Sequence, residues 1–480
     1  MKRAKVESNE SKIYRKIYGS LKAQIESGDL KPGAKLPSTR TLAATLNVSR
    51  HTVRRSYEEL CSQGYIKLAK GLRPIVLNSL ADIIIRPQIS ADTIPINFNI
   101  STFGQNIINS AGLSFTAVET LNEFNAGGAA LQELPINTWR KMLQKANSQS
   151  DYNLQNYQYN PFGSISLRES LVNYLSRSRG IQTVIDNIAI FNNTECGTDL
   201  LCRLILNPND NVIVENPGTP GARMMFQLHR ANLIPLKINQ RNVYLTELAD
   251  LPVKLIYLTP SHHDPLGTVM SLSDRINLIN WANEHNAFII EDDYDCEYHY
   301  TLPIQPSLKS LDNYDCIVYR YNFWRTLFPL TKLGFIVLPN RLISLLKKAK
   351  TFVERDTTLI DQEALAYFID EGHFERHIKR TRSVYAKRRT LTIQALTKLL
   401  KQFVKIYDGG GIQLILTFST NFSSAEILTA AKMCHLPLIS TNDYYLDNST
   451  PNEFILFYAH MPEYKIIETL KNFTLMLNRK

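Results

Sequence analysis

Residues 36–55 read Leu-Pro-Ser-Thr-Arg-Thr-Leu-Ala-Ala-Thr-Leu-Asn-Val-Ser-Arg-His-Thr-Val-Arg-Arg. This stretch contains two helix starts. Ser38 is a suitable N-cap for a helix that ends at about Leu46, and Ser49 caps the next helix after a turn at Asn47-Val48. Two helices joined by a turn of three or four residues form a helix-turn-helix. We therefore predict this motif near the start of the chain.

The sequence on either side completes a small domain. Upstream, isoleucine and leucine recur every four residues over 12–27, which predicts an amphipathic helix. Downstream, Gly64 ends the helix that starts at Ser49, and Tyr65-Ile66-Lys67-Leu68 followed by Gly71 is typical of a hairpin. The expected unit is a winged helix-turn-helix.

The net charge of the chain lies in this region. The 480 residues include 54 Lys and Arg and 44 Asp and Glu, and the first 80 contain 16 of the cations against 6 of the anions. The remaining 400 residues are therefore balanced. A small basic module on a large neutral body indicates a domain that binds the phosphate backbone of nucleic acid.

The helix that Ser49 caps carries Arg50, His51, Thr52 and Arg54 in its first turns. In a helix-turn-helix this end enters the major groove, where Arg contacts guanine and hydroxyl side chains contact phosphate. The alternative is a solvated basic helix without a DNA partner. The order of the helices, the turn, the wing and the local charge favour DNA.

Other features narrow the class of protein. The six cysteines are scattered and form no metal-binding pattern, which indicates reduced thiols and no metal site. No apolar run reaches the roughly 18 residues of a membrane span, and the N-terminus lacks the apolar core of a signal peptide. We expect a cytoplasmic protein with no membrane partner.

Downstream, helical patterns alternate with short apolar runs such as 254–258, 287–290 and 316–319. This alternation predicts an α/β body with a mainly parallel sheet, whose ligands bind at the carboxyl ends of the strands. Two strand ends carry polar side chains, at 291–295 and at 320–325. We expect a winged-helix domain at 11–78, a linker at 79–120 and a body at 121–480, with a smaller C-terminal α+β lobe from about residue 350.

The N-terminal module resembles the GntR-type winged helix over residues 11–76. The motifs that carry the resemblance are Leu30–Arg40, Val48–Val53, Tyr57–Leu60 and Gly64–Ile66. The resemblance implies that Arg40, Ser49, Arg50, Thr52 and Arg54 face DNA. The wing departs from the family pattern after Gly71, although Lys70 is placed to reach phosphate.

The body resembles the fold-type I aminotransferase domain that is fused to such helices in MocR/GabR-type regulators. The motifs are Asn160–Gly163, Asn216–Arg223, Thr259–Pro265, Glu291–Asp295 and Thr326–Pro329. The resemblance implies a head-to-tail homodimer and a site for pyridoxal phosphate (PLP). In that site Asp292 would pair with the pyridine nitrogen, and Tyr294 would bond the phenolic oxygen of the ring.

Several positions depart from the pattern of a PLP site. Arg325 occupies the position of the Schiff-base lysine, and a guanidinium is not an amine nucleophile. Trp324 replaces a small residue beside it, and Lys332 replaces an arginine that clamps phosphate. Thr194 and Glu195 occupy the phosphate-binding turn, Thr219 replaces a tyrosine, and Ile455 aligns with an arginine that binds carboxylate.

These departures predict that covalent PLP chemistry is lost and that no residue is catalytic. Arg325, Lys332 and Asp292 would then bind one another or a different anionic ligand. We expect a transcription regulator that binds double-stranded operator DNA and senses an unidentified small molecule through a dimeric body. The alternatives are a regulator that holds PLP without a covalent bond, an aminotransferase, and, for the acidic run at 291–295, a solvated loop.

Overall fold

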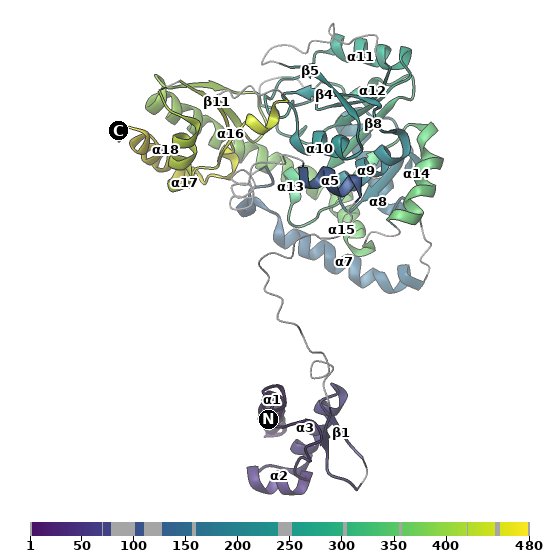
Figure 1. Cartoon of the computed structure of the whole chain (residues 1–480), viewed down its shortest axis with the longest axis vertical. Coiled ribbons are helices and arrows are strands. Elements are labelled where there is room, and N and C mark those ends of the chain that lie inside the picture. The colour runs from purple at the N-terminus through teal and green to yellow at the C-terminus, as the bar shows by residue number, and fades with distance from the viewer. Residues whose placement is uncertain are drawn as a thin grey trace. The chain divides into compact units, whose positions relative to one another are not determined.

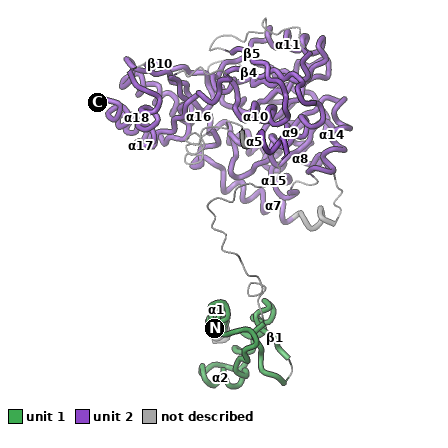
Figure 2. The backbone as a smooth tube through the Cα atoms, viewed as in Figure 1, with its two compact units in different colours: residues 1–99 green, residues 100–480 purple. Residues whose placement is uncertain are grey.

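The computed structural model describes residues 2–69, 71–77, 101–109, 127–155, 160–238, 252–300, 305–354, 358–419, 421–446 and 452–478. The chain divides into two compact units, residues 1–99 and 100–480 (Figure 2). Most of the predicted linker at 79–120 lies outside the described residues, apart from 101–109. The predicted domain boundaries therefore stay predictions.

Unit 1 is a three-helix domain with a two-stranded wing (Figure 1). Its elements are α1 (Lys2–Glu26), α2 (Thr39–Leu46), α3 (Arg50–Ser62), β1 (Ile66–Lys67) and β2 (Ile75–Val76). The strands pair antiparallel, with Ile66 opposite Val76. Helix α1 begins at Lys2, ten residues before the predicted start at residue 12. The prediction missed these residues because they carry no apolar repeat that would indicate a helix.

Both predicted N-caps of the helix-turn-helix are present. The Ser38 side chain accepts a hydrogen bond from the backbone amide of Thr41, and the Ser49 side chain accepts one from that of Thr52. Asn47 ends α2 in the left-handed conformation with φ 49°, which asparagine tolerates better than most residues. The apolar faces close on one core of Ile17, Leu36, Ala43, Val53, Tyr57, Leu60, Ile66 and Val76. The two N-caps, the turn at Asn47 and the shared core together fix the orientation of α3 relative to α2.

Unit 2 is built on a seven-stranded sheet in the order β3-β9-β8-β7-β6-β4-β5. The strands are β3 (Ile188–Phe191), β4 (Asn211–Asn216), β5 (Asn232–Lys237), β6 (Val253–Leu258), β7 (Phe288–Asp292), β8 (Ile317–Asn322) and β9 (Gly334–Val337). The five neighbouring strands β8, β7, β6, β4 and β5 are parallel, and β9 runs antiparallel to both of its neighbours, β8 and β3. The predicted mainly parallel sheet is confirmed.

Helices cover both faces of this sheet. On one face, β4, β6, β7 and β8 pack against α9 (Thr194–Ile205), α10 (Pro220–Leu228) and α14 (Asn340–Val353). On the other face they pack against α11 (Leu272–Glu284) and α12 (Leu308–Leu311). The remaining helices are α5 (Thr102–Asn109), α7 (Ile136–Gln155), α8 (Ile165–Arg179), α13 (Trp324–Leu327) and α15 (Leu359–Asp370), with 3-10 turns at Leu131–Glu133 and Ile185–Asn187. Because β6, β7 and β8 are neighbouring parallel strands, their carboxyl ends lie at the same edge of the sheet.

A smaller lobe follows, as predicted (Figure 1). The long helix α16 (His373–Leu400) leads into it and packs against α18 (Glu463–Leu477). Its antiparallel sheet has the order β10-β11-β13-β12. The other elements are β10 (Val404–Tyr407), β11 (Leu414–Phe418), β12 (Leu438–Ser440), β13 (Glu453–Leu456) and α17 (Ser424–Met433), with 3-10 turns at Asn442–Tyr444 and Tyr458–His460.

Among the helices in the described ranges, none combines the length and the apolar character needed to cross a bilayer.

Candidate functional site

The predicted DNA-contacting side chains lie at the starts of α2 and α3. Arg40, Ser49, Arg50, His51 and Arg54 are all exposed. The Nε atom of Arg50 donates a hydrogen bond to Thr39 Oγ1 at 3.3 Å, which links the two helix starts. The structure therefore brings these five residues onto the two helices of the motif, whereas Lys70 lies outside the described residues.

Thr52 differs from the expectation that it faces DNA. Its side chain is buried, with 4% of the residue exposed. Its hydroxyl lies 2.7 Å from the hydroxyl of Ser49, and its backbone amide donates to the same oxygen. Because it stands three residues after the N-cap, Thr52 belongs to the capping turn. Its side chain thus supports the first turn of α3 and does not lie on the exposed surface.

The neighbouring arginines of α3 have partners on the module itself. Arg54 forms an ion pair with Glu58 one turn later at 2.7 Å, and both side chains are more than half exposed. The guanidinium of Arg55 lies over the ring of Tyr14 at 4.2 Å. An exposed pair of this kind stabilises a helix by only about 0.3–0.5 kcal/mol, so it leaves Arg54 available to phosphate.

In the body, the acidic run at the end of β7 is buried, so its interpretation as a solvated loop is wrong. Glu291, Asp292 and Asp293 are each at most 6% exposed. Each of them faces a different buried cation. The ion pairs are Glu291 with Arg275 at 3.8 Å, Asp292 with Arg320 at 3.2 Å and Asp293 with Arg179 at 2.7 Å. A buried carboxylate needs such a partner to remain charged.

Asp292, the predicted partner of a pyridine nitrogen, is paired within the chain. Its Oδ1 atom lies 3.2 Å from Nε of Arg320, and its Oδ2 atom accepts a hydrogen bond from the hydroxyl of Tyr257. Burial raises the pKa of Asp292, while Arg320 and Tyr257 oppose that rise. Asp292 thus pairs with neither Arg325 nor Lys332, which corrects the expectation that these three residues bind one another.

Arg325 lies in α13 and is 8% exposed. Its guanidinium stands over the ring of Tyr294 at 4.9 Å, and its Nη1 atom has no hydrogen-bond partner among the described residues. Burial alone would lower its pKa, but Asp295, Tyr294 and Asp264 outweigh burial and raise it. Arg325 is therefore a permanent buried cation beside Tyr294.

The remaining predicted residues are spread around this strand edge. Thr194 is fully buried at the start of α9, and its hydroxyl accepts from Nη2 of Arg320 at 3.1 Å. Thr219 precedes α10 and donates to Asp264 at 3.4 Å. Lys332 is exposed, and none of its contacts with the described residues is an ion pair. Arg320 thus brings Asp292 and Thr194 together, since it contacts both of them.

Sequence reasoning missed the cations that balance the acidic run. Arg320 and Arg179 are both almost completely buried and take part in this network. Arg320 is the direct neighbour of Asp292 in the parallel pairing of β7 and β8. The available signal was an arginine inside an otherwise apolar strand, because such a residue in a central strand needs a buried anion.

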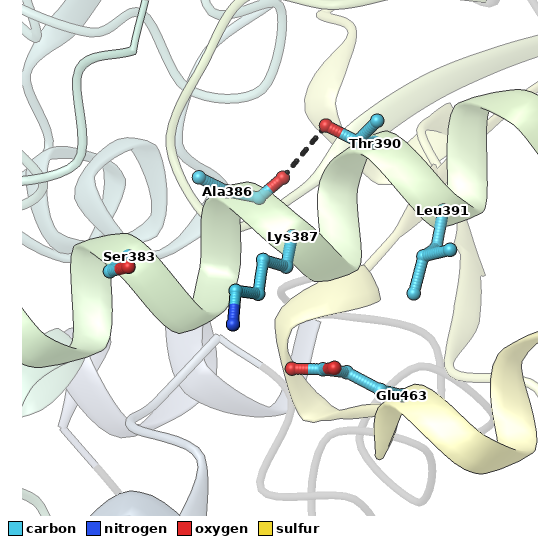
Figure 3. Close-up of a pocket in the computed structure, with 6 residues that line it drawn as sticks. All are labelled: Ser383, Ala386, Lys387, Thr390, Leu391 and Glu463. Carbon is cyan, nitrogen blue, oxygen red and sulfur yellow. Dashed lines mark hydrogen bonds between the residues drawn. The ribbon is translucent and has the colours of Figure 1, made fainter.

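A surface hollow of about 550 Å³ lies elsewhere, in the smaller lobe (Figure 3). One face of α16 and the first residue of α18 line it. The lining residues are Ser383, Ala386, Lys387, Thr390, Leu391 and Glu463. None of the residues predicted for the cofactor belongs to this hollow.

Comparison with known proteins gives two family matches. Residues 13–73 match the family described as bacterial regulatory proteins, gntR family, and residues 122–440 match aminotransferase class I and II. A similar protein is the uncharacterized HTH-type transcriptional regulator YdeL of Bacillus subtilis, with 29% identity over 96% of this chain and 95% of that one. The probable rhizopine catabolism regulatory protein MocR of Rhizobium meliloti is also 29% identical, over 88% of this chain and 84% of its own.

Among solved structures, the body resembles the kynurenine aminotransferase of Pyrococcus horikoshii, which was crystallised with PMP. The TM-score is 0.67 and the identity 26%, over 75% of this chain and 93% of that one. An archaeal alanine:glyoxylate aminotransferase gives a TM-score of 0.70 at 19% identity, over 79% of this chain and 98% of that one, and this shows the fold.

Proposed function

Because the chain belongs to the aminotransferase class I and II family and carries a gntR-family helix-turn-helix, we propose that its body regulates DNA binding without covalent PLP chemistry. The DNA-binding part rests on the family match and on relatives that are HTH-type transcriptional regulators. The single observation that carries the proposal for the body is the ion pair between Asp292 and Arg320.

The residues present do not fit covalent PLP. The position expected for the Schiff-base lysine is Arg325, a guanidinium that cannot serve as an amine nucleophile. Asp292 already faces Arg320, and the hydroxyl of Thr194 accepts from the same guanidinium. Glu195 places a carboxylate at the turn expected to hold phosphate, and phosphate and carboxylate repel each other. These four positions support a body that is not an aminotransferase.

Incubation of the purified chain with PLP tests this part of the proposal. We expect borohydride treatment to give no stoichiometric phosphopyridoxyl adduct at position 325, because Arg325 has no amine to react. The control is any PLP-dependent aminotransferase treated in parallel, which gains one phosphopyridoxyl group. A stoichiometric, borohydride-fixed adduct on the chain would contradict the proposal, and peptide mapping would locate it.

For the DNA-binding function, the decisive experiment is to map the sites that the chain occupies on its own genome. A regulator concentrates at a small number of related sequences, from which an operator duplex can be designed. Removal of residues 1–77 is expected to abolish binding to that duplex, because the exposed residues of α2 and α3 are then absent. Retention of operator binding by the truncated chain would refute the assignment.

The proposal includes a dimer that reads two half-sites of the operator. The body supports it with exposed apolar side chains at the end of α14, where Phe352 is 87% exposed and Val353 57% exposed. Adjacent exposed apolar side chains of this kind are candidates for a protein contact where they belong to a larger apolar patch. Sedimentation of the full chain distinguishes a dimer from a monomer.

A second candidate is a regulator that holds PLP without a covalent bond. Lys332 favours it, because it places an exposed amine, with no ion pair to the described residues, at the position expected to hold phosphate. This candidate predicts that PLP raises the midpoint of thermal unfolding of the wild-type chain.

A further inference from the structure

Arg320 touches both regions where a cofactor would be anchored. Its side chain is 5% exposed, and its Nε atom lies 3.2 Å from Asp292 Oδ1. Its Nη1 atom donates to Thr198 Oγ1 at 2.7 Å, and its Nη2 atom donates to Thr194 Oγ1 at 3.1 Å. A single guanidinium therefore connects the end of β7 with the first two turns of α9.

The sheet explains this placement. Arg320 and Asp292 are paired residues of the parallel strands β8 and β7, so both side chains project from the same face. Tyr257 of β6 projects from that face too, and its ring lies 5.8 Å from the guanidinium carbon of Arg320. Helix α9 covers this face, so Arg320 extends from the strand toward the helix start.

The contact with Asp292 is an ion pair rather than a hydrogen bond. Neither Arg320 Nε nor Asp292 Oδ1 has a hydrogen-bond partner among the described residues. Charge balance is therefore what Arg320 supplies to Asp292. A buried carboxylate without a counter-charge is strongly destabilising, and an arginine is the counter-charge that cannot lose its proton. Glu195 adds a further carboxylate at 2.9 Å from Nη2.

We propose that Arg320 is a built-in counter-cation for Asp292, so that the body keeps its charge balance and its fold without PLP. In the family, the cation at this aspartate would be a protonated pyridine nitrogen. Here a pyridine ring would have to share Asp292 with a cation that is always present. The inference rests on the proposed function of the body, and it concerns neither the winged helix nor the operator.

The test uses the full chain and three variants. Arg320→Met removes the charge and keeps an unbranched side chain, and Arg320→Met/Asp292→Asn removes both charges. Arg203→Met is the matched control, because Arg203 lies on α9, is half exposed and pairs with Asp199 at 2.8 Å, while Asp199 also keeps His229 as a partner at 2.7 Å. The measured quantity is the midpoint of thermal unfolding, with and without a large excess of PLP.

We expect PLP to leave the wild-type midpoint unchanged. Arg320→Met should lower the midpoint by several degrees more than Arg203→Met does, because it leaves Asp292 buried without a counter-charge. The added Asp292→Asn change should recover part of that loss. If the Arg320→Met chain cannot be obtained folded, recovery of a folded double variant supports the inference, and failure of both variants contradicts it.

Two results overturn the inference. One is a PLP-dependent rise in the wild-type midpoint, and the other is an Arg320→Met chain as stable as the Arg203→Met control. Operator binding is measured on the same samples. A wild-type chain that shows the expected midpoints but binds no operator refutes the proposed DNA-binding function and leaves Arg320 as assigned.

Discussion

Replacement of Arg179 by methionine is expected to lower the free energy of unfolding of the body by about 3–5 kcal/mol. Arg179 ends α8, and its Nε atom lies 2.7 Å from Oδ2 of Asp293, with the two side chains 3% and 0% exposed. Its Nη2 atom also donates to Ser261 at 2.8 Å. The variant keeps the Asp293 carboxylate buried with a hydrogen bond from Tyr319 at 2.8 Å but without its cation.

The sign of the pH dependence follows from the pKa of Asp293. Burial alone would raise this pKa, but Arg179 and the Tyr319 hydroxyl outweigh burial and lower it below its ordinary value of 3.8. In the wild type, this group stabilises the fold above that value, and the contribution is lost as the pH falls. Without Arg179, burial is expected to raise the pKa of Asp293 above its ordinary value of 3.8. Stability is then lost as the pH increases through that raised pKa. The destabilisation by Arg179→Met should therefore be smaller at acidic pH.

Urea denaturation followed by tryptophan fluorescence measures this change. The three tryptophans, Trp139, Trp281 and Trp324, all lie in unit 2, so the signal reports the body alone. Arg203→Met serves again as the exposed control and should change stability by at most about 1 kcal/mol. Arg179→Met/Asp293→Asn should recover much of the loss. A loss below about 1 kcal/mol for Arg179→Met would show that the buried pair does not stabilise the body.

Replacement of Arg50 by alanine is expected to weaken operator binding by about 1–3 kcal/mol, which is about 5- to 150-fold. Arg50 is the first residue of α3 and is exposed, and its hydrogen bond to Thr39 orients it across the two helix starts. An arginine at this end of a recognition helix is placed to contact guanine in the major groove. Loss of a base contact reduces specificity as well as affinity.

The measurement is a titration at fixed salt with the operator and with a scrambled duplex of the same composition. Arg50→Ala should lose more affinity for the operator than for the scrambled duplex. Arg15→Ala, an exposed arginine of α1, is the matched control and should not change the ratio between the two duplexes. Equal losses on both duplexes would reassign Arg50 to the phosphate backbone, and no loss on either would remove it from the interface.

The sequence predicts the winged helix well because its signals are local. Ser38 and Ser49 each cap a helix within three residues, so their roles can be read directly from spacing. The same rule explains why Thr52 is buried, because it is the third residue of the helix and its backbone amide donates to the N-cap Ser49. The positive charge of unit 1 predicts that the starts of α2 and α3 face DNA. The hydrogen bonds of the N-caps Ser38 and Ser49 determine which side chains of these two helix starts are exposed.

The buried ion pairs of unit 2 could not be predicted from local spacing in the sequence. Asp292 and Arg320 are 28 positions apart, and only the parallel register of β7 and β8 makes them neighbours. Arg179 reaches Asp293 from the end of a helix more than 100 positions earlier. The alternation of strands and helices predicts that strand ends meet, but it does not predict which cation faces which carboxylate.

The pairing of Asp292 with Arg320 also bears on what a single substitution could change. Solved structures that resemble the body include an aminotransferase, and Arg325→Lys would place an amine at this position. Asp292 would still face a resident guanidinium, and Lys332 and Glu195 would still differ from the family pattern. A lysine at position 325 would therefore not by itself leave the Asp292 carboxylate unpaired for a pyridine nitrogen.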